Sequence, residues 1–580
     1  MKLLEFKVSN YKVFNTEFSV NLSTGNTSEG NFTILTGKNN MGKSTFLEAI
    51  NEFFKPVGKT HAIPDDCYND TSKEIVLSAE ISIDQLNDVE IWNLLNKDTD
   101  SSEDTDSSED TDSSEDTNSS EILTITKTYT IENAGSFTVN MNGTKIPSKQ
   151  ATSIGKLLSD EEPYYIRPDM STEEINKLIS IIYSDAISSN LTHSAADLTE
   201  VNNKIKTYIG NLKSSTDQLL NSVSNDVSTT LNDLFKNQNL TIKIDGSVPG
   251  DVSIKDLLKN TNTNIKIDSP SRKDMLLSEQ GTGVKRMSLI YIIQNLIKKK
   301  IGNLGNRILL IDEPEAFLHP EAIRQLSSSL YEIGNYMPLI ITTHSPILIN
   351  LENDHTIIDI FKIDKTNSNA TTLFSSHNTQ FEADDRQNMK ILNYVDSYVN
   401  EFFFSDKNII VEGYTEKLVF QYIQKKYNLP FHIINARGKA TVKTLMKILN
   451  QFGADYYVLH DVDNNPQLEQ PTLIGQRTNC QNIFANKGKH SHVFGHNFTF
   501  EAAFYGNIEA SNQKTKKIFD IMESTDADKE NFTIKQDILA TYNKLFNLGI
   551  TEFDSCIPNQ KVIEITSADT INDLFQPLIL

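Results

Sequence analysis

Two groups of residues in this sequence could do chemistry, and they lie far apart along the chain. Near the N-terminus, the run Gly37-Lys38-Asn39-Asn40-Met41-Gly42-Lys43-Ser44 has the spacing of a nucleotide-binding P-loop. Glycines let backbone N–H groups point at the phosphates, while the lysine adds a positive charge and the serine offers a hydroxyl to Mg²⁺. The residues predicted to bind nucleotide here are Gly37, Asn39, Asn40, Gly42, Lys43, Ser44 and Thr45.

Acidic residues that could complete such a site follow an apolar run at 308–311. Asp312 would hold Mg²⁺ through water, and Glu313 would polarise the attacking water. His344 ends the next apolar run, where it is placed to sense the γ-phosphate. Each residue also has a plainer interpretation, because two acids can cap a buried strand and a lone histidine is commonly structural.

Four further carboxylates form the second group. Glu412 follows an apolar run, Glu416 lies one helical turn later, and Asp461 and Asp463 alternate at the end of another strand. Since alternate residues of a strand face the same side, Asp461 and Asp463 can share one edge. Oxygen-rich clusters of this kind bind Mg²⁺ or Mn²⁺, and two ions about 4 Å apart support phosphodiester hydrolysis. The alternative is a set of surface acids, which are ordinary in an acidic protein.

Strand and helix patterns surround both groups. The P-loop lies between a buried-type strand at 32–36 and a helix expected over 46–54, which is the context that the motif requires. The second group lies in a unit that begins near Asn408, with strands expected at 408–411, 431–434 and 456–460. The sequence therefore predicts the α/β fold class for both parts of the chain.

Length and charge limit the class of protein. At 580 residues the chain is too long for one ordinary core, so two or more domains are expected. Residues 98–121 repeat Thr-Asp-Ser-Ser-Glu-Asp and hold eleven of the 77 acidic residues. This segment is predicted to be a disordered loop, with a phosphorylatable regulatory segment as the alternative. Without it, 66 acidic residues face 54 basic ones, a net charge of −12, so any DNA contact must be a local basic patch.

Neither a membrane protein nor a disulfide framework is indicated. The sequence has no run of eighteen apolar residues and no charged-then-apolar leader, so a cytoplasmic protein without membrane contact is expected. Cys67, Cys480 and Cys556 are few and scattered, which argues against disulfides and against a zinc site.

The same patterns predict the domain organisation. Residues 1–365 are expected to form the first domain, with a polar helical segment inserted at about 165–245 that could serve as a dimer contact. A linker helix region is expected at 366–400. Residues 401–580 form the second domain, which closes with helical elements.

The order of motifs in the first domain resembles the ABC-type ATPase heads of the SMC and RecF kind. Between the P-loop and His344 come Gly281-Thr282-Gly283-Val284-Lys285-Arg286, Asp312-Glu313-Pro314-Glu315 and Leu318-His319-Pro320. The resemblance implies ATP as the nucleotide. It also implies that Gly281, Thr282 and Gly283 of one subunit close on the ATP of another, in a homodimer or higher homo-oligomer through the heads. The alternative is a glycine-rich turn before a helix.

The second domain resembles the Toprim (topoisomerase–primase) fold, on its Glu412-Gly413 and Asp461-Val462-Asp463 pairs. An ABC head followed by Toprim resembles the OLD (overcoming lysogenisation defect) family of nucleases, with its Gabija-type and retron-associated members. The resemblance implies a two-metal site, a further acid and a later lysine that stabilises the transition state. Glu501 matches the acid, and Lys514 matches the lysine, with Lys516 and Lys517 as alternatives. The alternative for Glu501 is an exposed acid on an amphipathic helix, and the alternatives for the lysines are a phosphate contact or a solvated helix face.

Basic residues between and after the acidic motifs have weaker signals. The run 487–492, together with His496, is expected to be a solvated loop, with a contact to DNA phosphate as the alternative. Arg437 and Lys439 are expected to face the scissile strand.

These motifs predict an ATP-regulated, divalent-metal-dependent DNA endonuclease of the OLD type that acts in prokaryotic antiphage defence. Glu412 and Asp461 would hold the central metal, and Asp463, Glu416 and Glu501 would complete the pair. The alternatives are a non-cleaving SMC/RecF-like DNA-binding scaffold and a nuclease that acts on RNA. A helicase, or a retron reverse transcriptase with its msDNA, is a candidate partner.

Overall fold

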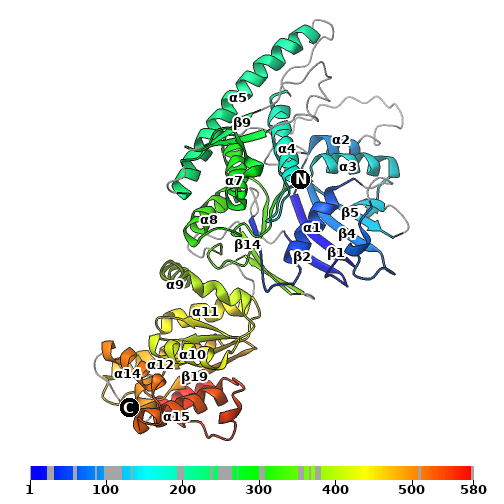
Figure 1. Cartoon of the computed structure of the whole chain (residues 1–580). Coiled ribbons are helices and arrows are strands. Elements are labelled where there is room, and N and C mark those ends of the chain that lie inside the picture. Colours follow the sequence, from blue (N-terminus) through cyan, green and yellow to red (C-terminus); the bar gives the residue numbers. More distant parts are fainter. Residues whose placement is uncertain are drawn as a thin grey trace, which may run out of the picture. The chain divides into compact units, whose positions relative to one another are not determined.

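The computed structural model describes residues 2–22, 32–56, 62–84, 88–96, 120–131, 135–191, 201–235, 239–245, 264–270, 272–299, 307–349, 358–364, 367–372, 381–506 and 511–576. These residues form two compact units (Figure 1). Unit 1 comprises Met1–Leu348 and Thr356–Thr372, and unit 2 comprises Ile349–His355 and Leu373–Leu580. The acidic repeat predicted at 98–121 lies outside the described residues except at its last two positions, which open a strand.

Unit 1 contains a mainly parallel sheet. Its strands, in spatial order, are β15 (Asn367–Thr372), β14 (Ile358–Asp364), β3 (Phe32–Thr36), β13 (Leu339–Thr342), β12 (Leu309–Ile311) and β8 (Tyr164–Ile166). All neighbours are parallel except β15, which pairs antiparallel with β14 at one edge. Every residue of β3, β12 and β13 is buried, as expected for central parallel strands covered on both faces. The segments that follow these strands therefore meet at one edge of the sheet.

A second, antiparallel sheet packs against the first through one helix. Its strands, in spatial order, are β2 (Phe18–Asn21), β1 (Lys2–Ser9), β4 (Ile75–Asp84), β5 (Ser120–Tyr129), β6 (Ser136–Met141) and β7 (Thr144–Lys145). Helix α1 (Lys43–Phe54) contacts β13 on one side and β1 and β4 on the other. Phe6 of β1 meets Phe46 and Phe53 of α1 edge-to-face, with ring centroids 5.4 and 5.7 Å apart. This aromatic core fixes the helix that follows the P-loop. Helices α2 (Val89–Asn96) and α3 (Ser148–Asp160) complete this side of unit 1.

The range in which a helical insertion was predicted, about 165–245, contains two long helices but also parts of two sheets. It begins in β8 and ends in β9 (Thr241–Asp245), which pairs with β10 (Asn264–Asp268), itself paired with β11 (Met275–Leu276). Its helices are α4 (Thr172–Leu191) and α5 (Val201–Leu234). Leu220, Val223, Val227 and Leu231 of α5 are buried at helical spacing. Helix α5 packs on β9 and on α7 (Thr282–Lys298), as Figure 1 shows. These apolar side chains are therefore buried within the subunit. A dimer contact through the helices stays a prediction.

Unit 2 is built on a five-stranded sheet. Its strands, in spatial order, are β17 (His432–Asn435), β16 (Asn408–Val411), β18 (Tyr456–Asp461), β19 (Ser491–His496) and the antiparallel β20 (Val562–Glu564). The chain steps outward from β16 to β17 through α10 (Tyr414–Tyr427) and back to β18 through α11 (Lys439–Gln451). Because parallel crossovers are right-handed, this reversal places α10 and α11 on opposite faces. The remaining helices are α12 (Gln470–Ala485), α13 (Phe500–Phe504), α14 (Ser511–Glu523), α15 (Lys529–Leu545) and α16 (Ala568–Phe575).

The two faces of this sheet have separate helix layers. Helix α10 packs with α14 and α15 over a core that includes Ile409, Val411, Leu459 and Phe494 of the strands. Helix α11 packs with α12, which in turn contacts α16. Side chains that continue the alternation of Leu459 and Phe494 therefore point toward α10.

The predicted linker helix region, 366–400, is divided between the two units. Strand β15 belongs to unit 1, whereas α9 (Ala383–Val395) packs on α11 in unit 2 and leads into the 3₁₀ helix Ser397–Phe404. Asp385 of α9 is fully buried and accepts hydrogen bonds from Thr444 and Lys447 of α11. The polar composition of this region suggested a linker. The partners that satisfy Asp385 lie about 60 residues later in the sequence, so the packing of α9 could not be predicted from the region itself.

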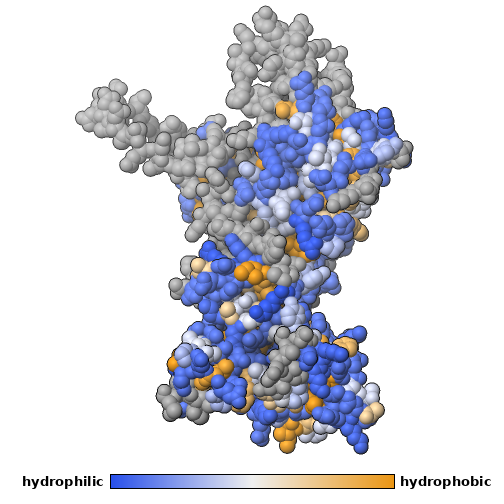
Figure 2. Space-filling model, turned by 90° about the vertical axis from the view of Figure 1, so that its left-hand side faces the viewer, coloured by the Kyte–Doolittle hydropathy of each residue, from blue (hydrophilic) through white to orange (hydrophobic). Residues whose placement is uncertain are grey.

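The surface is mainly hydrophilic on the face drawn in Figure 2, where hydrophobic residues form small separate groups among those that are coloured. Among the described residues, no helix combines the length and the apolar character that a membrane crossing requires.

Candidate nucleotide site and metal centre

The P-loop lies between β3 and α1, at the carboxyl edge of the unit 1 sheet. Gly37 and Gly42 have φ angles of 131° and 102°. A Cβ atom at Gly37 would lie 2.6 Å from the Ile363 carbonyl oxygen, and one at Gly42 would lie 2.6 Å from the Phe14 ring. Both positions therefore require glycine, as the motif predicted.

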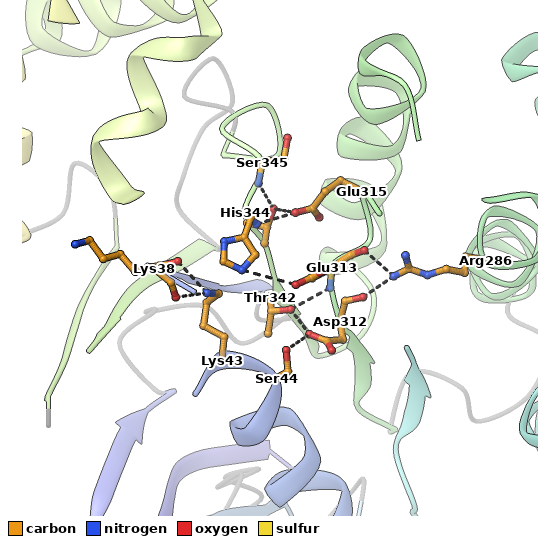
Figure 3. A network of polar contacts seen from close by, with 12 residues as sticks. Lys38, Lys43, Ser44, Arg286, Asp312, Glu313, Glu315, Thr342, His344 and Ser345 are labelled. Atoms are coloured by element: carbon orange, nitrogen blue, oxygen red, sulfur yellow. Dashed lines mark hydrogen bonds and ion pairs between the residues drawn. The ribbon is translucent and has the colours of Figure 1, made fainter. Parts of the chain in front are cut away.

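The ammonium group of Lys43 is held inside this loop. It donates hydrogen bonds to the carbonyl oxygens of Gly37 and Lys38, at 2.8 and 2.7 Å (Figure 3). Burial lowers the pKa of Lys43 to about 8, despite the opposing effect of the nearby Glu313 and Asp312 carboxylates. A phosphate group would stabilise the charged form of this lysine.

Asp312 joins three elements at the end of β12. Its Oδ1 atom accepts hydrogen bonds from the Ser44 hydroxyl, at 2.8 Å, and from the Thr342 hydroxyl. The Thr342 hydroxyl oxygen in turn accepts from the Glu313 backbone N–H at 3.0 Å. The structure thus brings together Ser44 and Asp312, the two residues predicted to hold Mg²⁺, from positions 268 residues apart.

Glu313 and His344 face each other beside Asp312 (Figure 3). The His344 Nε2 atom lies 3.7 Å from Glu313 Oε1. Burial, together with the charge of Lys43, lowers the pKa of His344 to about 4, so its ring is neutral near pH 7. Glu315 fixes this segment, because its Oε1 atom accepts from the Thr343 hydroxyl at 2.8 Å and from the His344 backbone N–H at 2.7 Å.

Arg286 connects the glycine-rich motif to these acids. It is 3% exposed, and its guanidinium group donates to the backbone carbonyls of Asp312 and Glu313, the latter at 2.7 Å. Burial lowers its pKa to about 10, and the neighbouring acids oppose that shift. Arg286 and Glu315 lie within two of the predicted motifs, but the sequence alone indicated no role for either.

The glycine-rich motif itself opens helix α7. Gly281 is the N-cap, and Thr282 and Gly283 are the first two helical residues. Gly281 is exposed, with φ −60°, and no atom lies within 4 Å of a Cβ atom built there. The single subunit therefore does not require glycine at position 281. Gly283 is tighter, because its Cβ atom would lie 3.3 Å from the Phe317 carbonyl oxygen.

The second predicted group gathers at the carboxyl edge of the unit 2 sheet. Asp461 ends β18 and His496 ends β19, and the strand register pairs these two residues directly. His496 Nδ1 lies 2.8 Å from Asp461 Oδ1, and His496 Nε2 lies 2.9 Å from the Tyr542 hydroxyl. By strand alternation with Leu459 and Phe494, both side chains point toward the α10 face.

Glu416 reaches the same place from the first turn of α10. Single ligand atoms of Glu416, Asp461 and His496 all lie within 4.8 Å of one another. Glu412 approaches from the end of β16, and its Oε2 atom accepts from the Asp461 backbone N–H at 3.0 Å. Gly413 lies between the two glutamates, where a Cβ atom would be 3.2 Å from Glu416 Oε2.

Burial and mutual repulsion act together on these carboxylates. Burial raises the pKa of Glu412 to about 7 and that of Glu416 to about 8, with repulsion from Asp461 adding to both. Burial, followed by repulsion from Asp463 and Glu501, raises the pKa of Asp461 well above its ordinary range. A divalent cation would favour the ionised forms, so the donor set fits a metal.

Asp463 has a different partner from Asp461. It follows β18 with φ 58°, and its Oδ2 atom accepts from Lys439 Nζ at 2.5 Å. Lys439 is 8% exposed and also donates to Gln476 at 2.9 Å. The ammonium group of Lys439 is thus held by Asp463 inside the unit, and the orientation of Lys439 toward the scissile strand stays a prediction. Arg437 is exposed and lies over the ring of Tyr414, which is itself 57% exposed.

Glu501 and Lys514 lie together next to this cluster. Glu501 is 4% exposed in α13, and its Oε1 atom is 3.1 Å from Lys514 Nζ. The backbone N–H of Phe500 donates to Asp461 Oδ1 at 2.9 Å, which joins α13 to the end of β18. Lys517 instead donates to Asn531 at 2.8 Å, and Lys516 is exposed.

His496 is the residue that sequence reasoning misplaced. It was grouped with the basic loop at 487–492, but it is fully buried on β19. His492, on the same strand, is exposed and pairs with Glu564 at 3.0 Å. The apolar pair Val493-Phe494 before His496 was the available signal for a strand, whereas the register that sets His496 beside Asp461 is a tertiary property.

Comparisons with known proteins agree with the division into two units. A family described as "AAA ATPase domain" matches residues 1–349, and one described as "Overcoming lysogenization defect protein-like, TOPRIM domain" matches residues 403–463. The Old nuclease of Escherichia phage P2 is 24% identical over 329 residues, 54% of each chain. The Endonuclease GajA of Bacillus cereus (strain HuB5-5) is 31% identical over 200 residues, 29% of each chain. The chain thus spans about half the length, or less, of these curated relatives.

Two solved structures are also similar to the chain. An SMC head bound to the C-terminal winged-helix domain of ScpA is 12% identical, with a TM-score of 0.40, and covers 64% of this chain and 99% of its own. The recombination mediator RecF with ATP is 14% identical, with a TM-score of 0.34 and the same coverage.

Proposed function

Because the chain belongs to the AAA ATPase domain family and carries an OLD-like TOPRIM domain, we propose that it is an ATP-regulated, divalent-metal-dependent DNA endonuclease. The observation that carries the proposal is the cluster at the carboxyl edge of the unit 2 sheet. There, the buried Glu416 and Glu501 and the half-buried Glu412 and Asp463 lie around Asp461, and Lys514 lies beside Glu501. The printed names of two relatives, Old nuclease and Endonuclease GajA, support the reaction class.

The proposed metal is Mg²⁺ or Mn²⁺. Its proposed ligands come from the set Glu412, Glu416, Asp461, Asp463 and Glu501. When bound, such a metal stabilises negative charge on a phosphate oxygen and lowers the pKa of water. The raised pKa values of Glu412 and Glu416 support this assignment, because clustered acids whose pKa values are shifted by burial are typical of metal and catalytic sites.

The chain's own residues have distinct tasks in phosphodiester hydrolysis. Lys514 would leave Glu501 and stabilise the charge that develops on the scissile phosphate. Lys439 holds Asp463 in place. Arg437 and Tyr414, both exposed and stacked, offer a cation and an aromatic face to the DNA strand next to Glu412.

The ATPase head would regulate this reaction. Lys43, Ser44 and Asp312 would hold ATP and its Mg²⁺, and Glu313 would polarise the attacking water beside a neutral His344. Gly281, Thr282 and Gly283 of a second copy would close on that ATP, so that the dimer state controls cleavage. The proposed location is the cytoplasm, where ATP and DNA are both available. A role in antiphage defence and a helicase or reverse transcriptase partner stay predictions from the resemblance.

Plasmid nicking by the full chain tests the proposal. With Mg²⁺ or Mn²⁺ the wild type is expected to nick supercoiled DNA, and Asp461→Ala is expected to lose at least about 100-fold in rate while it keeps ATP hydrolysis. Asp455→Ala is the matched control, because Asp455 precedes the amino end of the same strand and is exposed. ATP hydrolysis without nicking would favour the non-cleaving scaffold. Cleavage of tRNA but not of plasmid would favour the RNA alternative.

A further inference from the structure

We infer that His496 is a ligand of the metal centre and that, with Glu416 and Asp461, it makes the site select a first-row transition ion such as Mn²⁺ over Mg²⁺. The inference rests on the proposed nuclease only in assuming that unit 2 binds a metal. It goes further by naming a nitrogen ligand among the carboxylates and the metal preference that follows.

The position of His496 is fixed by the sheet and by the helices that cover it. The register of β18 and β19 places it directly beside Asp461, and none of its surface is exposed. Its ring meets the rings of Phe500 and Phe504 edge-to-face, with centroids 5.3 and 6.1 Å apart. The imidazole therefore cannot turn away from the acids without disturbing the core.

Glu416 provides a second, independent indication of a cation. It is 4% exposed, and in the described part of the chain no other residue donates a hydrogen bond to its carboxylate. Among the described residues, the backbone N–H of Glu416 itself is the donor that reaches this buried carboxylate, so most of its capacity to accept is unused and a cation bound there would satisfy it. Its ligand atom lies within 4.8 Å of those of Asp461 and His496, so one ion can reach all three.

Tyr542 supplies the hydrogen bond that metal-binding histidines usually make with their second nitrogen. Its hydroxyl lies 2.9 Å from His496 Nε2, and its ring stacks on Phe420 with an interplanar angle of 5°. If Nε2–H donates to this hydroxyl, the Nδ1 lone pair faces the acids and is available to a cation. Without a metal, the Tyr542 hydroxyl can instead donate to Nε2 while Nδ1–H donates to Asp461. The hydrogen bond between His496 and Tyr542 is therefore possible with and without a bound cation.

A nitrogen ligand has consequences for the choice of metal. Mg²⁺ prefers oxygen ligands and keeps several waters, whereas imidazole favours first-row transition ions. Two carboxylates and one imidazole therefore favour Mn²⁺ over Mg²⁺ at this position. The expected ratio of the two dissociation constants is at least about tenfold.

Pulsed EPR of Mn²⁺ bound to the full chain, without nucleotide, tests the assignment. Nitrogen coupling is expected in the wild type and should change when the protein is made with ¹⁵N-histidine. It is expected to vanish in His496→Gln and to persist in His492→Gln, a control on the same strand whose imidazole pairs with Glu564. Bound Mn²⁺ without histidine coupling, no binding of Mn²⁺, or coupling that survives in His496→Gln would each overturn the inference.

A second variant keeps the test decisive if His496→Gln does not fold. Tyr542→Phe preserves the stacked ring and removes the hydroxyl, so it is expected to keep the coupling while Mn²⁺ binds about tenfold more weakly. An unchanged dissociation constant would contradict the role of Tyr542 in orienting His496. No step of this experiment measures nicking. A protein that binds Mn²⁺ through His496 but leaves plasmid intact would refute the proposed nuclease and not this inference.

Discussion

Lys514, Lys516 and Lys517 lie on one helix, and their contacts separate them. Lys514 reaches Glu501 next to the acidic cluster, Lys517 is bound to Asn531, and Lys516 is exposed. We expect Lys514→Ala to lower the rate of plasmid nicking about 100-fold or more, because a positioned cation is lost from the transition state. Lys516→Ala and Lys517→Ala should nick at close to the wild-type rate.

Initial nicking rates at saturating metal, measured at two salt concentrations, distinguish this result from a general effect of charge. A loss that is equal for all three variants and shrinks at high salt would mean that the lysines attract DNA without a specific position. That outcome would remove Lys514 from the proposed catalytic residues.

At the scale of single residues, the sequence predicted what local motifs encode. The glycines and Lys43 of the P-loop are recognisable because phosphate binding needs those residue types at fixed spacing, and the structure shows the positive φ angles that explain them. His496, Lys439 and Arg286 could not be predicted in the same way. The position of each depends on a partner that only the folded chain brings near. These partners are Asp461 for His496, Asp463 for Lys439 and the Asp312 carbonyl for Arg286.

At the scale of elements, the contact between α9 and α11 was not predicted from the sequence, which indicated a linker there. Asp385 is fully buried, and it accepts hydrogen bonds from Thr444 at 2.7 Å and Lys447 at 2.6 Å. Asp385→Ala would leave the buried Lys447 ammonium without this partner, so we expect α9 and α11 to lose about 3–5 kcal/mol of local stability. Hydrogen exchange of the backbone amides in these helices measures that loss. Glu382→Ala, which removes an exposed partner of Lys443 and the N-cap side chain of α9, should cost less, about 1–2 kcal/mol.

The same ion pair predicts a dependence on pH. Burial alone would raise the pKa of Asp385, but hydrogen bonds from Lys447, the Glu382 backbone and Thr444 lower it below 3.8. The unfolded state therefore takes up a proton before the folded state does as the pH falls. The stabilisation is complete above pH 3.8 and is lost as the pH falls through the folded-state pKa, so wild type and Asp385→Ala should converge in acid. If the difference in local stability between wild type and Asp385→Ala stayed constant down to the folded-state pKa of Asp385, the ion pair would be contradicted.

Elements whose own pattern is strong were predictable, and elements stabilised by neighbours were not. The strands at 308–311 and 408–411 are apolar runs that only a buried sheet accommodates. By contrast, β15 is polar except for Ala370 and owes its place to pairing with β14. Strand β8 has three residues and was predicted as the start of a helical insertion, because its partner β12 lies more than 140 residues away in sequence.

At the scale of the whole molecule, the ATPase site should need a second copy of the chain. Gly281 is exposed at the start of α7, with no atom within 4 Å of a Cβ atom built there. Gly281→Asp therefore fits the single subunit, and aspartate is a favourable N-cap, so thermal stability should not fall. We expect this variant to bind ATP through its intact P-loop but to lose the ATP-dependent dimer, because its carboxylate would repel the partner's phosphates. Light scattering with a non-hydrolysable ATP analogue measures the dimer.

Mixing two inactive variants shows whether the glycine-rich motif acts between subunits. Lys43→Ala disables the P-loop, and Gly281→Asp disables the motif, so each protein alone should hydrolyse ATP slowly. In a mixed dimer, the intact P-loop of the Gly281→Asp subunit faces the intact motif of the Lys43→Ala subunit, and one complete site is restored. Because a mixed dimer has one complete site of two, the mixture should hydrolyse ATP faster than either variant alone, at up to about half of the wild-type rate. If the motif served its own subunit instead, the mixture would stay as inactive as its components, since no subunit would then contain both intact parts.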